Sequence, residues 1–97
     1  MRRLNEELVF MFHKLASVKA DSDYRLIAQF ADGTVKIYDV KPLFERWEAL
    51  RELENAPELF YDVKVDTGGY GIVWNDELDL SCDELFENGI EVGQKSA

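Results

Sequence analysis

The chain has 97 residues, of which 46% are hydrophobic and 32% are charged, as expected of one small folded domain. Twenty acidic residues against eleven basic ones give a formal net charge of −9 at pH 7, which argues against direct binding to nucleic acid or to an anionic membrane. The single cysteine excludes an internal disulfide, and the single histidine excludes a metal site made of several His or Cys ligands.

No targeting or membrane-spanning segment is evident in the sequence. No apolar run approaches the roughly 20 residues that a membrane-spanning helix needs. The first ten residues contain two arginines, but acidic residues follow directly and no long apolar stretch develops, which argues against a signal peptide. We therefore expect a soluble, cytoplasmic protein that needs no metal and no organic cofactor.

The acidic excess lies entirely in the second half of the chain. Residues 1–48 contain eight acidic and eight basic residues, whereas residues 49–97 contain twelve acidic and three basic ones. The densest acidic segment, residues 76–91, contains no Lys or Arg. It is either a solvated face that keeps the protein in solution or a surface for a basic protein partner. The candidate partner-binding residues are Trp74, Asp76, Glu77, Asp79, Asp83, Glu84 and Glu87.

The sequence predicts a single domain over residues 13–92, preceded by an extension and followed by a disordered tail over residues 93–97. In the extension, residues 1–12, apolar residues recur at helical spacing. The apolar run at residues 8–12 fits the start of a strand equally well, so helix and strand both stay open for this segment.

A β-hairpin is predicted over residues 24–40. Its turn is Asp32-Gly33, a pair favoured in the two-residue type I′ turn because both positions need a positive φ. With this turn the numbers of paired residues sum to 65, which places Phe30 opposite Val35 on the core side of the sheet.

An amphipathic helix is predicted after this hairpin. It begins near Pro42, which is tolerated in the first turn of a helix, and it ends between Asn55 and Pro57. Its apolar residues recur at helical spacing opposite a charged face, and we expect them to cover one face of the sheet. These apolar residues are Leu43, Phe44, Trp47, Leu50 and Leu53.

A second hairpin is predicted over residues 61–74. Apolar and polar residues alternate on both sides of Gly68-Gly69, and the numbers of paired residues sum to 137, which places Ile72 opposite Val65. The fold predicted from these elements is α+β, with a small antiparallel or mixed sheet built from two hairpins and one central amphipathic helix on one face.

A short C-terminal helix completes the predicted fold. Ser81 with Glu84 three residues later forms a capping-box pattern, and Gly89 fits the C-terminal cap.

Cys82 follows the N-cap, where a helix terminus can lower a thiol pKa, but the neighbouring Asp83 and Glu84 oppose a thiolate. His13 lies in no recognisable catalytic motif. We therefore expect a protein that is not an enzyme.

Several short motifs follow one another in a fixed order over residues 13–88, and as an ordered set they resemble the bacterial domain of unknown function 2442 family. Members of that family usually have Trp-Pro-Asn-Gly where this chain has Trp74-Asn75-Asp76-Glu77. The motifs are Tyr24-Arg25-Leu26, Phe30-Ala31-Asp32-Gly33, Tyr38-Asp39-Val40-Lys41-Pro42-Leu43, Pro57-Glu58-Leu59-Phe60, Val63-Lys64-Val65-Asp66, Ile72-Val73-Trp74, Leu78-Asp79-Leu80 and Glu84-Leu85-Phe86.

The resemblance implies a small α+β fold and no established catalytic residues. It also implies that members occur alone or joined to a helix-turn-helix domain, and that some are encoded in two-gene operons like those of toxin–antitoxin pairs. This chain has no helix-turn-helix segment, so direct DNA binding is not expected.

Two functions remain open on this basis. The first is a non-enzymatic protein-interaction or regulatory module, in one form antitoxin-like, that binds a basic partner through the acidic segment and a partly exposed Trp74. The alternative is a small-ligand-sensing domain with a pocket between sheet and helix, lined by Trp47, Tyr61 and Trp74. A homodimer is a further expectation, because a short sheet leaves an open edge.

Overall fold

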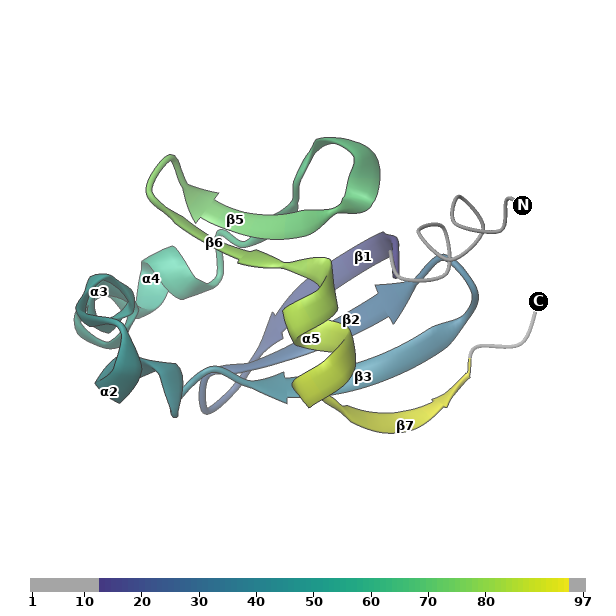
Figure 1. Cartoon of the computed structure of the whole chain (residues 1–97). Helices are drawn as coiled ribbons and strands as arrows, with labels where there is room; N and C mark the ends of the chain where they lie inside the picture. Colours follow the sequence, from purple (N-terminus) through teal and green to yellow (C-terminus); the bar gives the residue numbers. More distant parts are fainter. Residues whose placement is uncertain (1–12, 95–97) are drawn as a thin grey trace.

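The computed structural model describes residues 13–94, and these form two antiparallel sheets (Figure 1). The strand order is β1-β2-β3-β7 in the first sheet and β4-β5-β6 in the second. The predicted α+β class with antiparallel hairpins is thereby confirmed. The strands are β1 (Leu15–Asp21), β2 (Arg25–Phe30), β3 (Thr34–Asp39), β4 (Lys64–Val65), β5 (Gly71–Asn75), β6 (Leu78–Ser81) and β7 (Ile90–Gln94).

The helices in the described part of the chain are all short. Helices α2, α3 and α4 gather at one end of the molecule, and α5 lies across one face of the four-stranded sheet (Figure 1). None of the described helices is long and apolar enough to cross a membrane. They are α2 (Leu43–Arg46), the 3-10 turn η1 (Glu48–Leu50), α3 (Arg51–Asn55), α4 (Pro57–Phe60), the 3-10 turn η2 (Thr67–Gly69) and α5 (Cys82–Asn88).

One hydrophobic core joins the two sheets and the helices. Its fully buried large side chains come from every layer, and they include Phe30 of β2, Phe60 of α4, Ile72 of β5 and Leu85 of α5. Burying apolar area of this kind is the main favourable contribution to folding. The two sheets and α5 therefore stabilise one another, because each contributes side chains to the same core.

The first hairpin forms with a register one residue away from the predicted one. Gln29 pairs with Val35 and Ala28 with Lys36, so the numbers of paired residues sum to 64. Only Gly33 has a positive φ in this turn, 96°, whereas a type I′ turn needs two such residues. The carboxylate of Asp32 instead accepts the backbone N–H of Thr34 at 2.9 Å, which also lowers the pKa of Asp32. A three-residue loop therefore replaces the predicted two-residue one.

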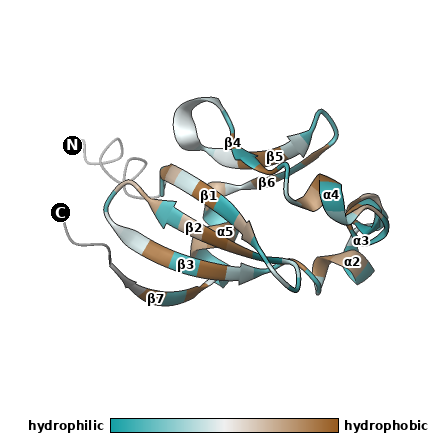
Figure 2. Cartoon of the chain, turned by 180° about the vertical axis from the view of Figure 1, so that it is seen from behind, coloured by the Kyte–Doolittle hydropathy of each residue, from teal (hydrophilic) through white to brown (hydrophobic). Residues whose placement is uncertain are grey.

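This shift moves side chains between the two faces of the sheet. Lys36 lies on the core face, where its Nζ is 4.4 Å from the ring centroid of Phe86 on α5. On the opposite face Ile37 pairs with Ile27 on one side and with Ile90 on the other. Figure 2 looks onto this face, which no helix covers, and shows hydrophobic segments of β3 and β7 side by side. This face is open and mixed, with the isoleucines beside charged side chains such as Lys19 and Arg25.

The predicted amphipathic helix is divided at Trp47. The backbone of Trp47 is extended, with φ −130° and ψ 111°, and it separates α2 from η1 and α3. Leu50 and Leu53 remain buried as predicted, but 43% of the Trp47 surface is exposed. The guanidinium Nε of Arg51 donates to the carbonyl oxygen of Phe44 at 2.9 Å, a group that a continuous helix would satisfy internally. The break thus leaves one aromatic side chain at the surface.

Three strands lie outside the predicted elements, β1, β6 and β7. The loop between β1 and β2 places Asp23 and Tyr24 at positive φ, 62° and 58°. The ring of Tyr24 contacts Phe44 and Phe60, with centroids 5.3 and 5.0 Å away, and its hydroxyl donates to the carbonyl of Glu54 at 3.1 Å. These contacts hold the strained loop and tie the sheet to the helical end.

The predictions for the chain ends are tested only in part. Strand β7 extends to Gln94, two residues into the segment expected to be disordered. The choice between helix and strand for residues 1–12 falls outside the described residues, as do residues 95–97.

The second hairpin forms as predicted at its centre. Val65 pairs with Ile72, and both glycines of the turn have positive φ, 86° at Gly68 and 82° at Gly69. Regular pairing of β4 is shorter than expected, since it covers only residues 64–65. A Cβ at Gly69 would lie 2.7 Å from the backbone oxygen of Leu15 on β1. The turn therefore packs directly against the start of the first sheet.

The two glycines allow a matched test of this packing. Gly68→Ala meets only the end of the Tyr70 side chain, so we expect a loss of about 1–2 kcal/mol in the free energy of unfolding, from the positive φ alone. Gly69→Ala adds a clash with backbone and is expected to cost clearly more. Urea denaturation of both variants measures the difference, and equal losses would contradict the close approach of the turn to β1.

Candidate functional site

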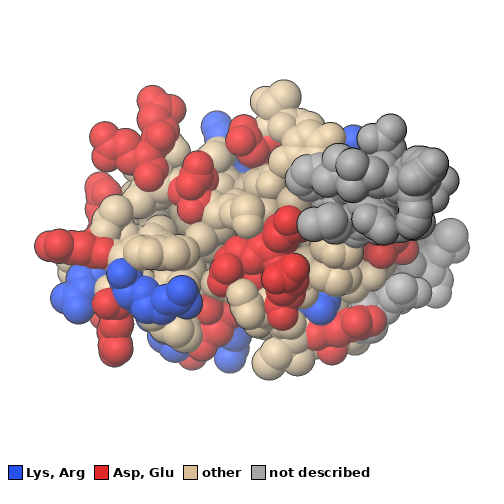
Figure 3. Space-filling model, in the orientation of Figure 1, with Lys and Arg blue, Asp and Glu red and all other residues tan. Residues whose placement is uncertain are grey.

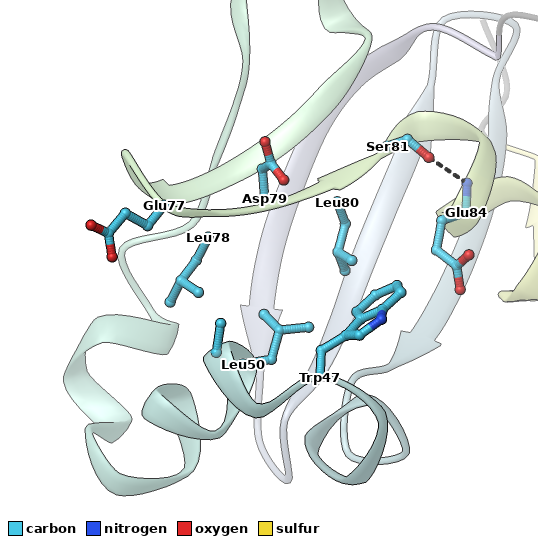
Figure 4. Close-up of a pocket in the computed structure, with 9 residues that line it drawn as sticks. Trp47, Leu50, Glu77, Leu78, Asp79, Leu80, Ser81 and Glu84 are labelled. Atoms are coloured by element: carbon cyan, nitrogen blue, oxygen red, sulfur yellow. Dashed lines mark hydrogen bonds between the residues drawn. The ribbon is translucent and has the colours of Figure 1, made fainter.

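A hollow of about 400 Å³ lies between β6 and the segment that joins α2 to α3 (Figure 4). Its walls come from two segments about 30 residues apart in sequence and from the start of α5. The lining residues are Trp47, Ala49, Leu50, Glu77, Leu78, Asp79, Leu80, Ser81 and Glu84.

The floor of the hollow is apolar because of the alternation along β6. Successive side chains of a strand point to opposite faces, so Leu78 and Leu80 point toward Leu50 and Trp47, whereas Asp79 points away from them (Figure 4). Asp79 therefore contributes backbone to the wall and directs its carboxylate elsewhere.

Trp47 forms the aromatic wall. The extended backbone at this residue turns its side chain out of the core, and the indole is left partly exposed beside Leu80 (Figure 4). The guanidinium carbon of the neighbouring Arg46 lies 5.3 Å from the Trp47 ring. Arg46 lines a separate hollow, together with Tyr38 and Glu84. The indole thus already packs against one cation.

Glu84 lies at the end of the hollow near Trp47 (Figure 4). Its carboxylate atom Oε2 accepts the hydroxyl of Tyr38 at 2.7 Å and the side-chain amide of Asn88 at 3.0 Å. Burial, together with the hydrogen bond and the negative charge of Glu84, raises the pKa of Tyr38 far above its usual range. Tyr38 therefore remains a protonated donor, and it fixes the orientation of Glu84.

The N-cap predicted at Ser81 is confirmed, and it positions Glu84. The backbone N–H of Glu84 donates to Oγ of Ser81 at 3.1 Å. Gly89 is the C-cap of the helix, as predicted, and its backbone is extended. A Cβ there would lie 2.5 Å from the carbonyl oxygen of Leu85, so glycine is required by close approach.

Removing this cap is expected to weaken α5. Ser81→Ala leaves the backbone N–H of Glu84 without its acceptor, and we expect the free energy of unfolding to fall by about 1 kcal/mol. Ser81→Thr keeps the acceptor oxygen and is the matched control. Thermal and urea denaturation measure both variants, and a Ser81→Ala protein as stable as the parent would argue against the cap.

The structure distributes the acidic candidates over three elements. Asp76 and Glu77 lie in the turn between β5 and β6, Asp79 on β6, and the others on α5. Figure 3 shows acidic side chains over this turn and over α5 on one face, with basic side chains gathered toward the end that carries α2. The turn itself is held by Asn75, whose Oδ1 accepts the backbone N–H groups of Glu77 and Leu78. On α5, Asp83 is half-buried and Glu87 is exposed.

Trp74 was predicted to be a partly exposed anchor, and this prediction is wrong. Only 4% of its surface is exposed. Its indole Nε1 donates to the carbonyl oxygen of Phe60 at 3.1 Å, and its ring stacks on Phe60 with centroids 6.2 Å apart. Trp74 belongs to the core because Phe60 of α4 packs on its ring, and the exposed tryptophan is Trp47.

Of the three residues predicted to line a pocket between sheet and helix, only one lines the observed hollow. Trp47 lines the hollow as expected, but Trp74 is buried and Tyr61, with 58% of its surface exposed, lies outside it. The apolar floor was missed, although the alternation of Leu78 and Leu80 with Asp79 in the sequence already indicates it.

The remaining reactive side chains offer no site. Cys82 is buried, and burial together with the charge of Asp83 raises the pKa of its thiol, which disfavours the thiolate. His13 stacks on Phe86 with ring centroids 3.5 Å apart. Within residues 13–94, no group of three or more His, Cys, Asp or Glu residues could hold a metal ion.

Two antiparallel sheets around one core, with an open hollow beside an exposed tryptophan, define a small α+β domain. The chain belongs to the family described as "Protein of unknown function (DUF2442)", whose model matches residues 15–91 of the 97. The resemblance inferred from the ordered motifs is thereby confirmed. No curated protein and no solved structure matches the chain.

Proposed function

We propose that this protein is a non-enzymatic interaction or regulatory module that binds a basic protein partner. The observation that carries the proposal is the face in which acidic side chains of the β5–β6 turn and α5 adjoin an apolar hollow with an exposed tryptophan (Figures 3 and 4). The acids supply long-range attraction, and the exposed indole of Trp47 supplies apolar area to bury on contact.

Binding would proceed in two stages. The charge excess on this face accelerates the encounter with a positively charged partner and orients it, an effect that salt screens. Packing against the exposed Trp47 then slows dissociation, because aromatic anchors carry much of the binding energy at interfaces. An antitoxin-like role, in which the partner is a small basic protein held inactive, is one form of this proposal.

A small-ligand-sensing role is the second candidate. The size of the hollow favours it, since about 400 Å³ lies within the range of ligand pockets. Its openness to solvent and its acidic surroundings fit a protruding side chain of a partner better than an enclosed neutral molecule. A thermal-shift screen of small molecules tests this alternative.

The proposal is tested by affinity capture from the native host. The parent protein is compared with a variant that carries Asp76→Asn, Glu77→Gln, Asp79→Asn and Asp83→Asn, and each is washed at low and then high salt. We expect the parent to retain a basic protein that high salt releases, and the variant to retain much less of it.

The control neutralises the same number of charges elsewhere, with Glu52→Gln, Glu54→Gln, Glu58→Gln and Asp62→Asn, all exposed and on or beside α3 and α4. Equal capture by the parent and both variants would contradict the proposal, because the acidic face would then make no difference.

The homodimer expected from the sequence stays a prediction. Strand β7 lies at the edge of the four-stranded sheet, with 72% of Ile90 and 56% of Val92 exposed. If two copies associate through this edge, Ile90→Lys is expected to give a monomer. Light scattering coupled to size-exclusion chromatography measures the mass, and a parent protein that is monomeric at high concentration would refute the prediction.

A further inference from the structure

We propose that the hollow beside Trp47 takes one arginine side chain of the partner, with its guanidinium between the indole and Glu84. This inference rests on the proposed function and specifies the group that is recognised. It follows from three features of the hollow: its apolar floor, its aromatic wall and the carboxylate at one end (Figure 4).

The floor suits the aliphatic part of an arginine. Leu50, Leu78 and Leu80 face the hollow from two segments (Figure 4). Long basic side chains lay their methylene groups along apolar surfaces of this kind while the charged group stays at a polar edge. A carboxylate side chain could not use this floor in the same way, because the surrounding acids would repel it.

The wall and the carboxylate suit the charged end. A guanidinium is planar, stacks on tryptophan and matches a carboxylate with paired hydrogen bonds. Within the chain, the guanidinium of the neighbouring Arg46 lies over the Trp47 ring, 5.3 Å from its centroid. Arg46 does not line the hollow beside Trp47 but a second one, and no described Lys or Arg lines the first.

Glu84 is held ready for such a contact. Tyr38 and Asn88 both bond to Oε2, and within residues 13–94 no partner is found for Oε1. Bonds from two neighbours restrict the side chain, which reduces the entropy that binding would otherwise cost. The remaining oxygen is the acceptor for the incoming guanidinium.

The test uses blocked tripeptides as probes and the full chain labelled with ¹⁵N. The peptides are Gly-Arg-Gly, Gly-Lys-Gly and Gly-citrulline-Gly, where citrulline is the uncharged counterpart of arginine. We expect the arginine peptide to shift the Trp47 indole N–H signal in a saturable way, the lysine peptide to bind more weakly and the citrulline peptide weakest. The Trp74 indole signal, whose N–H is bonded to Phe60 in the core, is expected to stay in place.

Two variants of equal charge change localise the contact. Glu84→Gln removes the carboxylate at the hollow, and we expect affinity for the arginine peptide to fall roughly threefold to tenfold. Asp79→Asn removes a carboxylate that points away from the hollow (Figure 4), and we expect less than a twofold change. Equal losses in both variants, equal binding of arginine and citrulline peptides, or an unmoved Trp47 signal would overturn the inference.

This outcome is separable from that of the proposed function. If the peptide experiment fails while capture of a basic protein still depends on the acidic face, the arginine anchor is refuted and the interaction module stands. If the peptide binds as expected but no partner is captured through the acidic face, the proposed function is refuted.

Discussion

Trp74→Ala is expected to lower the free energy of unfolding by about 3–5 kcal/mol, the range for removing a large aromatic side chain from a core. Trp74 is 4% exposed, stacks on Phe60 and donates its indole N–H to the carbonyl of Phe60. Trp74→Phe keeps most of the volume but leaves that carbonyl without its donor, so an intermediate loss of about 1–3 kcal/mol is expected. Urea denaturation followed by circular dichroism measures both.

Trp47→Ala is the matched control. The same side chain is removed from a partly exposed position, and we expect a loss of about 1 kcal/mol or less. The two tryptophans thus have opposite roles, with Trp74 stabilising the core and Trp47 available for contact. Comparable losses for the two alanine variants would contradict this assignment.

Leu85→Ala is expected to cost about 2–5 kcal/mol, the second large effect. Leu85 is completely buried where α5 packs against β3, β5 and β6, so alanine leaves a cavity between the helix and both sheets. The same helix positions Glu84. We therefore also expect the Leu85→Ala protein to show weaker protection of α5 backbone amides in hydrogen exchange.

Glu87→Ala controls for the effect of changing helix α5 itself. Glu87 is exposed on the same helix, and its replacement is expected to change stability by no more than about 0.5 kcal/mol. If Leu85→Ala were as stable as Glu87→Ala, α5 would not be anchored in the shared core.

Elements specified by short-range chemistry could be predicted from the sequence. Gly68-Gly69 supplies the two positive φ values that its turn uses, and Ser81 caps α5 through a bond to a residue three positions later. The first hairpin shows the limit of such reasoning. Asp32-Gly33 suits two loop lengths, and the choice depends on whether Asp32 adopts a positive φ or bonds to Thr34.

The division of the central helix could not be predicted, because no glycine or proline marks it. The bond from Arg51 to the carbonyl of Phe44 accompanies the break, and no pattern in the sequence indicates it. The exposure of Trp47 depends on this break. The burial of Trp74 likewise depends on α4, a helix outside the predicted elements, because Phe60 of that helix covers the indole.

The composition identified the acidic candidate residues, but it did not indicate which way their side chains point. Sequence order places Glu77, Asp79 and Glu84 close together, and all three border the hollow. Alternation along β6 separates Asp79 from Leu78 and Leu80, and this signal was available in the sequence. The position of Glu84 beside Trp47 could not be predicted from the sequence, since it depends on how α5 and the α2–α3 segment pack around one hollow.

The most direct test of the proposed interaction is the affinity of the captured basic partner for the parent protein and for the two fourfold variants, measured by calorimetry at low and high salt. We expect that neutralising Asp76, Glu77, Asp79 and Asp83 weakens binding roughly tenfold or more at low salt, with the difference shrinking at high salt. Neutralising Glu52, Glu54, Glu58 and Asp62 is predicted to have a much smaller effect. Equal affinities for the two variants at low salt would contradict a role of the acidic face in binding.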